Sequence, residues 1–303
     1  MPFKLHKVKV NILFNILKNQ KLSGKIKAEK RFFTMSEIYN KICITSVTST
    51  VCKLFGIDTP DNTDKPDEII TALAEKKLGK GKIDRAVLYN PDAVALWLYQ
   101  KYTDIFTKAA LRSDLALPLL SVMPSVTPVC FASMYTGVLP DIHGIKKYEK
   151  PVLTTDTLFD YFIKAGKKCA IVSTARDSIS MIFLEREMDY FIYDTPDEVN
   201  KRALELIDED NYDLIVIYNG NYDGTMHKHG PEAAESMNAL RHNIDAYAEI
   251  TDRIFEKWSA HDVFYGFMPD HGCHEIDGEC GSHGLDMEED MNIIHFYGIK
   301  AKA

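Results

Sequence analysis

Short apolar runs alternate with amphipathic stretches from residue 85 to the end of the chain. Runs of four to eight residues suit buried strands, and the stretches between them repeat apolar residues at helical spacing. The predicted strands are Ala86–Tyr89, Leu115–Val122, Cys169–Ser173, Tyr190–Tyr193, Leu214–Tyr218, Val263–Met268 and Ile293–Tyr297. The predicted helices are Ala93–Lys108, the single turn Phe131–Tyr135, Thr155–Ala165, Ile179–Arg186, Glu198–Glu209 and Glu232–Trp258. This alternation predicts an α/β fold, a three-layer sandwich with a mostly parallel central sheet flanked by helices.

The pattern before residue 85 is less regular. Residues 59–82 are rich in Pro, Asp, Lys and Gly, and we expect a surface connection there with one helical run, Pro66–Lys77. Residues 1–60 predict no element securely.

The first 34 residues form a basic arm. They contain nine Lys or Arg and one acid, Glu29, which is a net charge of +8, whereas the whole chain carries −8. The arm does not resemble a secretory signal, because its apolar stretch is short and no small-residue cleavage site follows. One interpretation is that the arm is a solvated basic tail. The other is that translation begins at Met35, so that the arm is an artefact of the start codon assigned to the sequence. We favour the second interpretation and expect a single catalytic domain over residues 35–303.

The composition is that of a globular protein. Of the 303 residues, 46% are hydrophobic and 26% are charged, which excludes intrinsic disorder, collagen and small disulfide scaffolds. No apolar run approaches the ~18–20 residues that span a bilayer, so we expect no membrane partner. The acidic net charge argues against a nucleic-acid scaffold. Six scattered cysteines are typical of reduced thiols in a cytoplasmic protein.

Acidic, hydroxyl and imidazole side chains follow the predicted strands. Because ligands of open α/β sheets bind beyond the carboxyl ends of the strands, these positions are candidates for chemistry. They are Asp92, Thr127 within Pro124–Pro128, Asp223, His227, Asp270 and His271, with His283 in a later loop. A lone Asp at a strand end usually caps a helix, but the joint pattern is that of ligands for zinc or a similar ion. Two such ions ~3.5–4 Å apart could act together on an in-line displacement.

The segment from Pro124 to Ile145 resembles the nucleophile region of the alkaline phosphatase superfamily, in its branch of type I phosphodiesterases and nucleotide pyrophosphatases. Thr127 precedes Thr136-Gly137 by nine residues, and Pro-Asp-Ile-His-Gly-Ile follows at 140–145. Three further motifs occur in the order of that branch, over a match from about Arg85 to Tyr297. They are Asp223-x-x-x-His227 with the trailing Gly230-Pro231, Asp270-His271-Gly272, and His283-Gly284.

This resemblance implies an alkaline-phosphatase-like core with two zinc sites, with manganese or iron as alternative metals. Asp223, His227 and His283 would hold one ion, and Asp92, Asp270, His271 and the Thr127 oxygen the other. Thr127 would attack the phosphorus of a small-molecule phosphoester in line and form a phosphothreonine intermediate. The gaps between the motifs are too short for a large cap domain. A homodimer is compatible with the sequence.

The match departs from the branch next to the nucleophile region. The branch usually has an Asn where this chain has Tyr148, so Tyr148, Lys146 and Arg176 are the candidate substrate contacts, with Arg186 a further one. The lysines could instead be surface charges. The substrate class therefore stays open between a diester, a monoester and a phosphonate. A phosphosugar mutase would need larger insertions, and a protein that binds metal or phosphate without turnover is the remaining alternative.

Other Cys and His residues carry weaker signals. Cys273, His274, Cys280 and His283 are poorly spaced for a zinc knuckle, so we expect the thiols to be bystanders. We expect His229 to support the metal motif and His143 to be structural. His242, His261 and His295 are expected to be surface or core residues.

Overall fold

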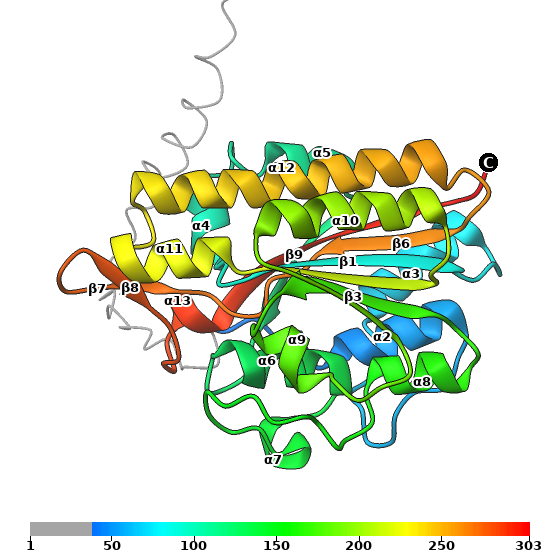
Figure 1. Cartoon of the computed structure of the whole chain (residues 1–303), viewed down its shortest axis with the longest axis horizontal. Coiled ribbons are helices and arrows are strands. Elements are labelled where there is room, and N and C mark those ends of the chain that lie inside the picture. Colours follow the sequence, from blue (N-terminus) through cyan, green and yellow to red (C-terminus); the bar gives the residue numbers. More distant parts are fainter. Residues whose placement is uncertain (1–37) are drawn as a thin grey trace, which may run out of the picture. The chain divides into compact units, whose positions relative to one another are not determined.

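Seven strands form the central sheet of the computed structural model, which describes residues 38–303 (Figure 1). They are β1 (Arg85–Pro91), β2 (Leu115–Leu120), β3 (Cys169–Thr174), β4 (Asp189–Tyr193), β5 (Leu214–Asn219), β6 (Val263–Phe267) and β9 (Asn292–Lys300). Their order across the sheet is β2-β9-β6-β1-β5-β3-β4. Only β9, among these described strands, runs antiparallel to its neighbours, so the carboxyl ends of the other six meet at one edge. The prediction of a mostly parallel sheet is confirmed.

Helices cover both faces of the sheet, as Figure 1 shows. One layer contains α2 (Ser46–Phe55), α3 (Glu68–Leu78), α6 (Thr127–Thr136), α8 (Leu158–Lys164) and α9 (Ser178–Ile182). The other contains α4 (Leu96–Lys101), α5 (Thr107–Arg112), α10 (Pro196–Glu209), α11 (Asn221–His229) and α12 (Ala234–Lys257). Side chains alternate along each strand, so in β1 Ala86 and Leu88 pack against the first layer and Val87 and Tyr89 against the second. The predicted three-layer sandwich is confirmed.

Three small elements complete the described residues. A short helix, α7 (Pro140–His143), follows α6, and a hairpin of β7 (His274–Ile276) and β8 (Cys280–Ser282) lies outside the main sheet. The four-residue helix α13 (Glu288–Met291) leads directly into β9. Residues 37–303 form one unit, so no separate cap domain is inserted in the part of the chain that the structure describes. The expectation for the basic arm, residues 1–34, lies outside the described residues.

Local sequence signals explain where several helices begin. Thr157 and Asp160 form a reciprocal capping box at the start of α8, and Thr195 and Glu198 do the same for α10. Each pair satisfies backbone N–H groups that the first turn of a helix leaves free. Among residues 38–303, no helix combines the length and the apolar character needed to cross a bilayer.

Several predicted segments differ from the structure. The single turn predicted at Phe131–Tyr135 is part of the ten-residue helix α6, and the helix predicted at Ile179–Arg186 ends at Ile182. The helix predicted at 93–108 is two short helices, because Ala93 adopts a left-handed φ of 63° and Ala95 pairs with Ile293 of β9 as an isolated bridge. In the predicted surface connection at 59–82, the expected helical run Pro66–Lys77 is present as α3, but one face of this helix packs on the core instead of lying on the surface. Ile70 is only 3% exposed, and the helix-capping Asp67 is 6% exposed.

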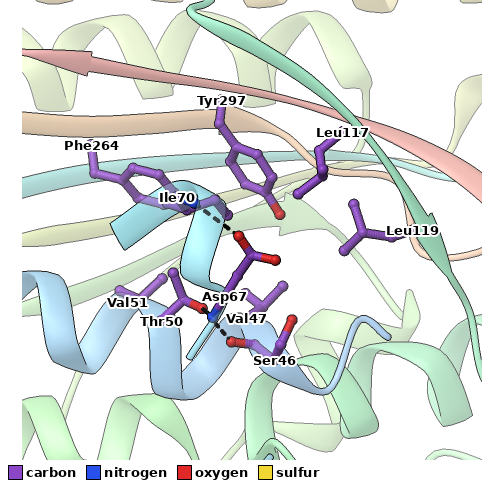
Figure 2. A pocket seen from close by; sticks show the side chains of 10 residues that line it. All are labelled: Ser46, Val47, Thr50, Val51, Asp67, Ile70, Leu117, Leu119, Phe264 and Tyr297. Carbon is purple, nitrogen blue, oxygen red and sulfur yellow. Dashed lines mark hydrogen bonds between the residues drawn. The ribbon is translucent and has the colours of Figure 1, made fainter. Parts of the chain in front are cut away.

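Figure 2 shows the pocket in which Asp67 lies, between α2, the start of α3 and the sheet. The Asp67 carboxylate accepts a hydrogen bond from the Ile70 N–H (2.8 Å), and the Asp67 N–H donates to Thr50 Oγ1 (2.7 Å). None of the predicted site residues lines this pocket. It therefore belongs to the packing of the first helical layer.

Candidate metal centre

The topology brings the predicted ligands to one edge of the sheet. Asp92 directly follows β1, and Asp270 and His271 follow the neighbouring strand β6. Asp223 lies in the first turn of α11, which follows the other neighbour of β1, strand β5. Residues from separate parts of the chain thus meet because the ends of adjacent parallel strands are adjacent.

Asp92, Asp270 and His271 form a buried group, here called cluster A, whose candidate ligand atoms all lie within 4.8 Å of one another. The His271 Nε2 atom is 3.3 Å from Asp92 Oδ1 and 3.3 Å from Asp270 Oδ2. The Thr127 hydroxyl lies beside this cluster, 3.3 Å from Asp92 Oδ2 and 3.3 Å from His271 Nε2. Thr127 is the first residue of α6 and is 4% exposed.

Asp223, His227 and His283 form cluster B, with the same 4.8 Å limit between candidate ligand atoms. Asp223 and His227 are four residues apart on α11, so they share one face of that helix. The Asp223 Oδ1 atom is 3.2 Å from His227 Nε2 and 3.4 Å from His283 Nε2. The His283 ring stacks on the ring of His271 with 4.0 Å between centroids, so clusters A and B are adjacent.

Hydrogen bonds set the tautomer of all three imidazoles. The Nδ1 atoms of His227, His271 and His283 lie 3.0, 2.9 and 2.8 Å from the carbonyl oxygens of Gly281, Gly272 and Ser125. A carbonyl oxygen only accepts, so each Nδ1 carries a hydrogen, and each Nε2 presents a lone pair when its ring is neutral. The Nε2 atoms of His227 and His283 are 3.2 Å apart, so in the neutral rings both lone pairs are available at one position in cluster B. This orientation is the usual one for histidine ligands of a metal.

Three carboxylate oxygens in the clusters are buried without a hydrogen-bond partner. They are Asp92 Oδ1, Asp223 Oδ1 and Asp270 Oδ2. A buried anion without a compensating group is unfavourable, whereas a divalent cation would satisfy these oxygens and the Nε2 lone pairs together. Each cluster therefore offers the mixed oxygen and nitrogen donors that suit zinc, and the residues fit one cation per cluster.

No family model matches the chain, and no curated protein matches it, but solved structures do. Human ectonucleotide pyrophosphatase/phosphodiesterase 5 superposes with a TM-score of 0.56 at 10% identity, over 71% of this chain and 87% of that chain. The murine protein of the same name gives 0.50 at 12% identity, over 64% and 58%. Phosphonoacetate hydrolase from Sinorhizobium meliloti gives 0.48 at 18% identity, over 65% and 59%.

The chain has an alkaline-phosphatase-like fold. The resemblance inferred from the motifs is thereby confirmed at the level of the fold. The chain spans less than two thirds of the murine protein and of the phosphonoacetate hydrolase.

The charges at this edge of the alkaline-phosphatase-like fold are strongly perturbed. Burial, and then the charge of Asp223, raise the pKa of Asp92 to about 7, and burial raises the pKa of Asp270 well above its usual range. The carboxylate of Asp223 raises the pKa of His227 to about 9. Burial would raise the pKa of Asp223 itself, but His227 and His283 outweigh it and hold this pKa below its ordinary value. A cation that occupied cluster B near neutral pH would therefore displace a proton.

Residues that the sequence did not single out support cluster A. Tyr218, near the end of β5, donates a hydrogen bond to Asp92 Oδ2. The Ser121 hydroxyl donates to the carbonyl of Asp270 (2.6 Å), and His295 Nε2 donates to the carbonyl of Pro269 (2.7 Å). These three side chains come from three different strands or strand ends, so no local spacing could have identified them.

The candidate substrate contacts lie on two connected segments. Tyr148 is 62% exposed, and Lys146 forms an ion pair with Asp141 (2.7 Å). The Lys150 Nζ atom donates to the carbonyl of Arg176 (2.8 Å), which joins the 146–150 loop to the segment after β3. That segment follows the carboxyl end of β3, the edge of the sheet at which both clusters lie.

Arg186 was also a candidate phosphate contact, and this prediction is wrong. Its side chain is 7% exposed and forms an ion pair with Asp160 of α8 (3.0 Å). It also donates to the carbonyl of Leu153 (3.1 Å). Arg186 precedes β4, at the amino edge of the sheet, which is opposite to the clusters.

The remaining Cys and His residues lie outside both clusters. The Nδ1 atom of His274 is 2.7 Å from Asp290 Oδ1, and Cys273 is buried next to Tyr222, so within residues 38–303 they form no zinc knuckle. His229 is exposed. His143 is buried and bonded to Ser133 (2.9 Å), as expected for a structural residue.

Proposed function

We propose that the protein is a metal-dependent phosphoester hydrolase of the phosphodiesterase and nucleotide pyrophosphatase type that acts through Thr127. The observation that carries the proposal is the position of the Thr127 hydroxyl, 3.3 Å from a carboxylate and an imidazole of cluster A. A threonine hydroxyl is a weak nucleophile unless a base or a metal activates it. Here it lies against a group of residues that fit a cation, and a second such group is adjacent.

Clusters A and B would each hold one ion, with zinc as the proposed metal and manganese or iron as alternatives. Asp92, Asp270, His271 and the Thr127 oxygen would hold one, and Asp223, His227 and His283 the other. When bound, such a pair supplies electrostatic stabilisation of the attacking and leaving oxygens of an in-line displacement.

Thr127 would carry the covalent step. Its Oγ1 atom forms a bond to phosphorus as the bond from phosphorus to the leaving oxygen breaks, which gives a phosphothreonine. Water then cleaves the new bond from phosphorus to oxygen and restores the hydroxyl, so the net reaction adds water across one ester bond. Thr127 lies at the amino end of the ten-residue helix α6, where the helix dipole favours the negative oxygens of a phosphoryl group.

Tyr148, Lys146 and Arg176 are the proposed substrate contacts for a small-molecule phosphoester. The hydroxyl of Tyr148 would donate the hydrogen bond that an Asn provides in the diesterase branch. A phosphomonoesterase or phosphonate hydrolase is the second candidate. Three lysines on the loop at 146–150 favour it, because they could compensate the higher charge of a monoester or phosphonate.

The test compares hydrolysis of bis(4-nitrophenyl) phosphate and 4-nitrophenyl phosphate by the zinc-loaded full chain. We expect Thr127→Ala to lose about 10³-fold or more in kcat. The matched control is Thr136→Ala, which removes a buried threonine of the same helix whose hydroxyl bonds to backbone groups, the carbonyl of Ala132 and the N–H of Val138. This control should retain activity. Full activity of Thr127→Ala would overturn the nucleophile assignment, and metal binding without hydrolysis of any ester by the wild type would overturn the hydrolase.

A further inference from the structure

Asp290 is a buried carboxylate that belongs to neither cluster and yet contacts the segments that carry both. It lies in α13 and is 0% exposed. Its Oδ1 atom is 2.7 Å from His274 Nδ1, and its Oδ2 atom accepts a hydrogen bond from the N–H of Leu285 (2.9 Å). Its backbone carbonyl accepts a third bond, from the N–H of Gly272 (2.7 Å).

The partners of Asp290 are close in sequence to ligands of different clusters. Gly272 directly follows His271 of cluster A. Leu285 is two residues after His283 of cluster B. One residue thus holds the backbone of a cluster A segment and the backbone of a cluster B segment at once.

The backbone of the cluster A segment lies so close to α13 at Gly272 that no side chain fits between them. A Cβ atom at Gly272 would lie 2.0 Å from the carbonyl oxygen of Glu289 and 2.9 Å from Ala95 Cβ. Only glycine therefore permits this approach. The backbone after His271 thus lies directly against α13 and is bonded to it through Asp290.

The hairpin β7–β8 is held in the same way against the helix that carries the rest of cluster B. A Cβ atom at Gly281 would lie 2.2 Å from Met226 Sδ in α11. The carbonyl of Gly281 is the partner of His227 Nδ1. The segment from Gly272 to Asp290 is thus packed against α11 near its middle, at Gly281, and its two ends are joined by the bond from Gly272 to Asp290.

We propose that Asp290 is a positioning residue that sets clusters A and B relative to each other, so that the affinities for the two cations depend on it jointly. This inference rests on the proposed function only in requiring that the clusters bind cations. The Asp290 carboxylate acts through the backbone N–H of Leu285 and through His274, and its backbone carbonyl holds Gly272. Asp290 touches no ligand atom itself. Partners in this outer position typically change metal affinity by about 10–100-fold when they are removed.

The test is a titration of the metal-free full chain with Co²⁺, followed by visible absorption. We expect Asp290→Asn to weaken binding at both sites by about 10-fold or more. The matched control is Asp67→Asn in the pocket of Figure 2, because Asp67 is also a buried carboxylate that accepts a backbone N–H at a helix end. This control should lower the unfolding temperature and leave the Co²⁺ affinity unchanged.

Wild-type affinity at both sites in Asp290→Asn would overturn the inference, and so would an equal loss of affinity in Asp67→Asn. If Asp290→Asn does not fold, the same Co²⁺ titration is made on His274→Gln. This variant changes one partner of the Asp290 carboxylate and keeps the hydrogen bond from the Leu285 N–H to Asp290. Weaker Co²⁺ binding in His274→Gln then supports the inference, and wild-type binding overturns it. The titration uses no ester, so a wild type that binds two Co²⁺ ions and hydrolyses nothing refutes the hydrolase without affecting this result.

Discussion

The hydroxyl of Tyr218 donates a hydrogen bond to Asp92 Oδ2 inside the buried end of the sheet. Tyr218 lies in β5 and Asp92 directly follows β1, and these two strands pair in parallel. The bond occupies one oxygen of the carboxylate and leaves Oδ1 directed at His271 Nε2, 3.3 Å away. It therefore orients the only member of cluster A that follows β1.

Replacement of Tyr218 by Phe tests this role. The variant removes one donor to a candidate ligand, so we expect the affinity for the ion proposed at cluster A to fall by about tenfold. Zinc retained after dialysis against a competing chelator measures the change. The control is Tyr135→Phe, since Tyr135 is also buried and donates to Asn90 rather than to a ligand. Equal zinc retention in the two variants would contradict the prediction.

Arg176 and Arg186 should respond in opposite ways to substitution by Ala. Arg186→Ala removes the positively charged partner of Asp160 in a largely buried setting and leaves only the capping bonds from Thr157, which should cost about 2–3 kcal/mol of unfolding free energy. Its kcat/KM should stay at the wild-type value. Arg176→Ala should leave the unfolding temperature unchanged and lower kcat/KM by about tenfold, as expected for a charged contact to phosphate. Thermal unfolding and steady-state kinetics on both variants provide the check, and a kinetic defect in Arg186→Ala alone would reverse the assignment.

The hydroxyl of Tyr148 should matter more than its ring. Tyr148→Phe removes a neutral hydrogen-bond donor and should lower kcat/KM for the preferred ester by about 3–10-fold. Tyr148→Asn restores the residue type of the diesterase branch and should raise the ratio of diester to monoester hydrolysis. The side chain is 62% exposed, so neither change should affect unfolding. Unchanged kinetics in both variants would remove Tyr148 from the substrate site.

Buried neutral His143 makes stability depend on pH. Burial lowers its pKa from 6.5 to about 4, so between these pH values the unfolded chain binds a proton that the folded protein does not. The unfolding free energy should therefore fall as the pH drops below 6.5, by about 1 kcal/mol per pH unit from this residue. Urea unfolding of the metal-free protein at pH 6.5 and 5.0 measures the slope. His143→Gln should reduce the slope, and an identical slope in the variant would refute the prediction.

The sequence by itself determined which elements form and where the candidate ligands lie along them. Apolar runs specify the strands most clearly in the middle of the sheet, where β1, β5 and β6 are buried between two helical layers. The residues that follow a parallel strand then lie at the carboxyl edge of the sheet. Asp92, Asp223 and Asp270 could be placed at one edge for this reason. The spacing of Asp223 and His227 also specified a common helix face.

Tertiary structure alone decided the contacts between segments that are distant in sequence. His283 reaches His227 from 56 residues away, and Arg186 pairs with Asp160 because a helix returns to the amino edge of the sheet. The segment at 93–95 is a turn followed by a bridge rather than a helix, because Ala93 has a left-handed φ and Ala95 pairs with Ile293 of β9. The periodicity of the sequence shows which face of a single helix or strand is buried. It does not show which distant residue forms a hydrogen bond with a buried polar side chain or backbone group, and the contacts described above depend on that.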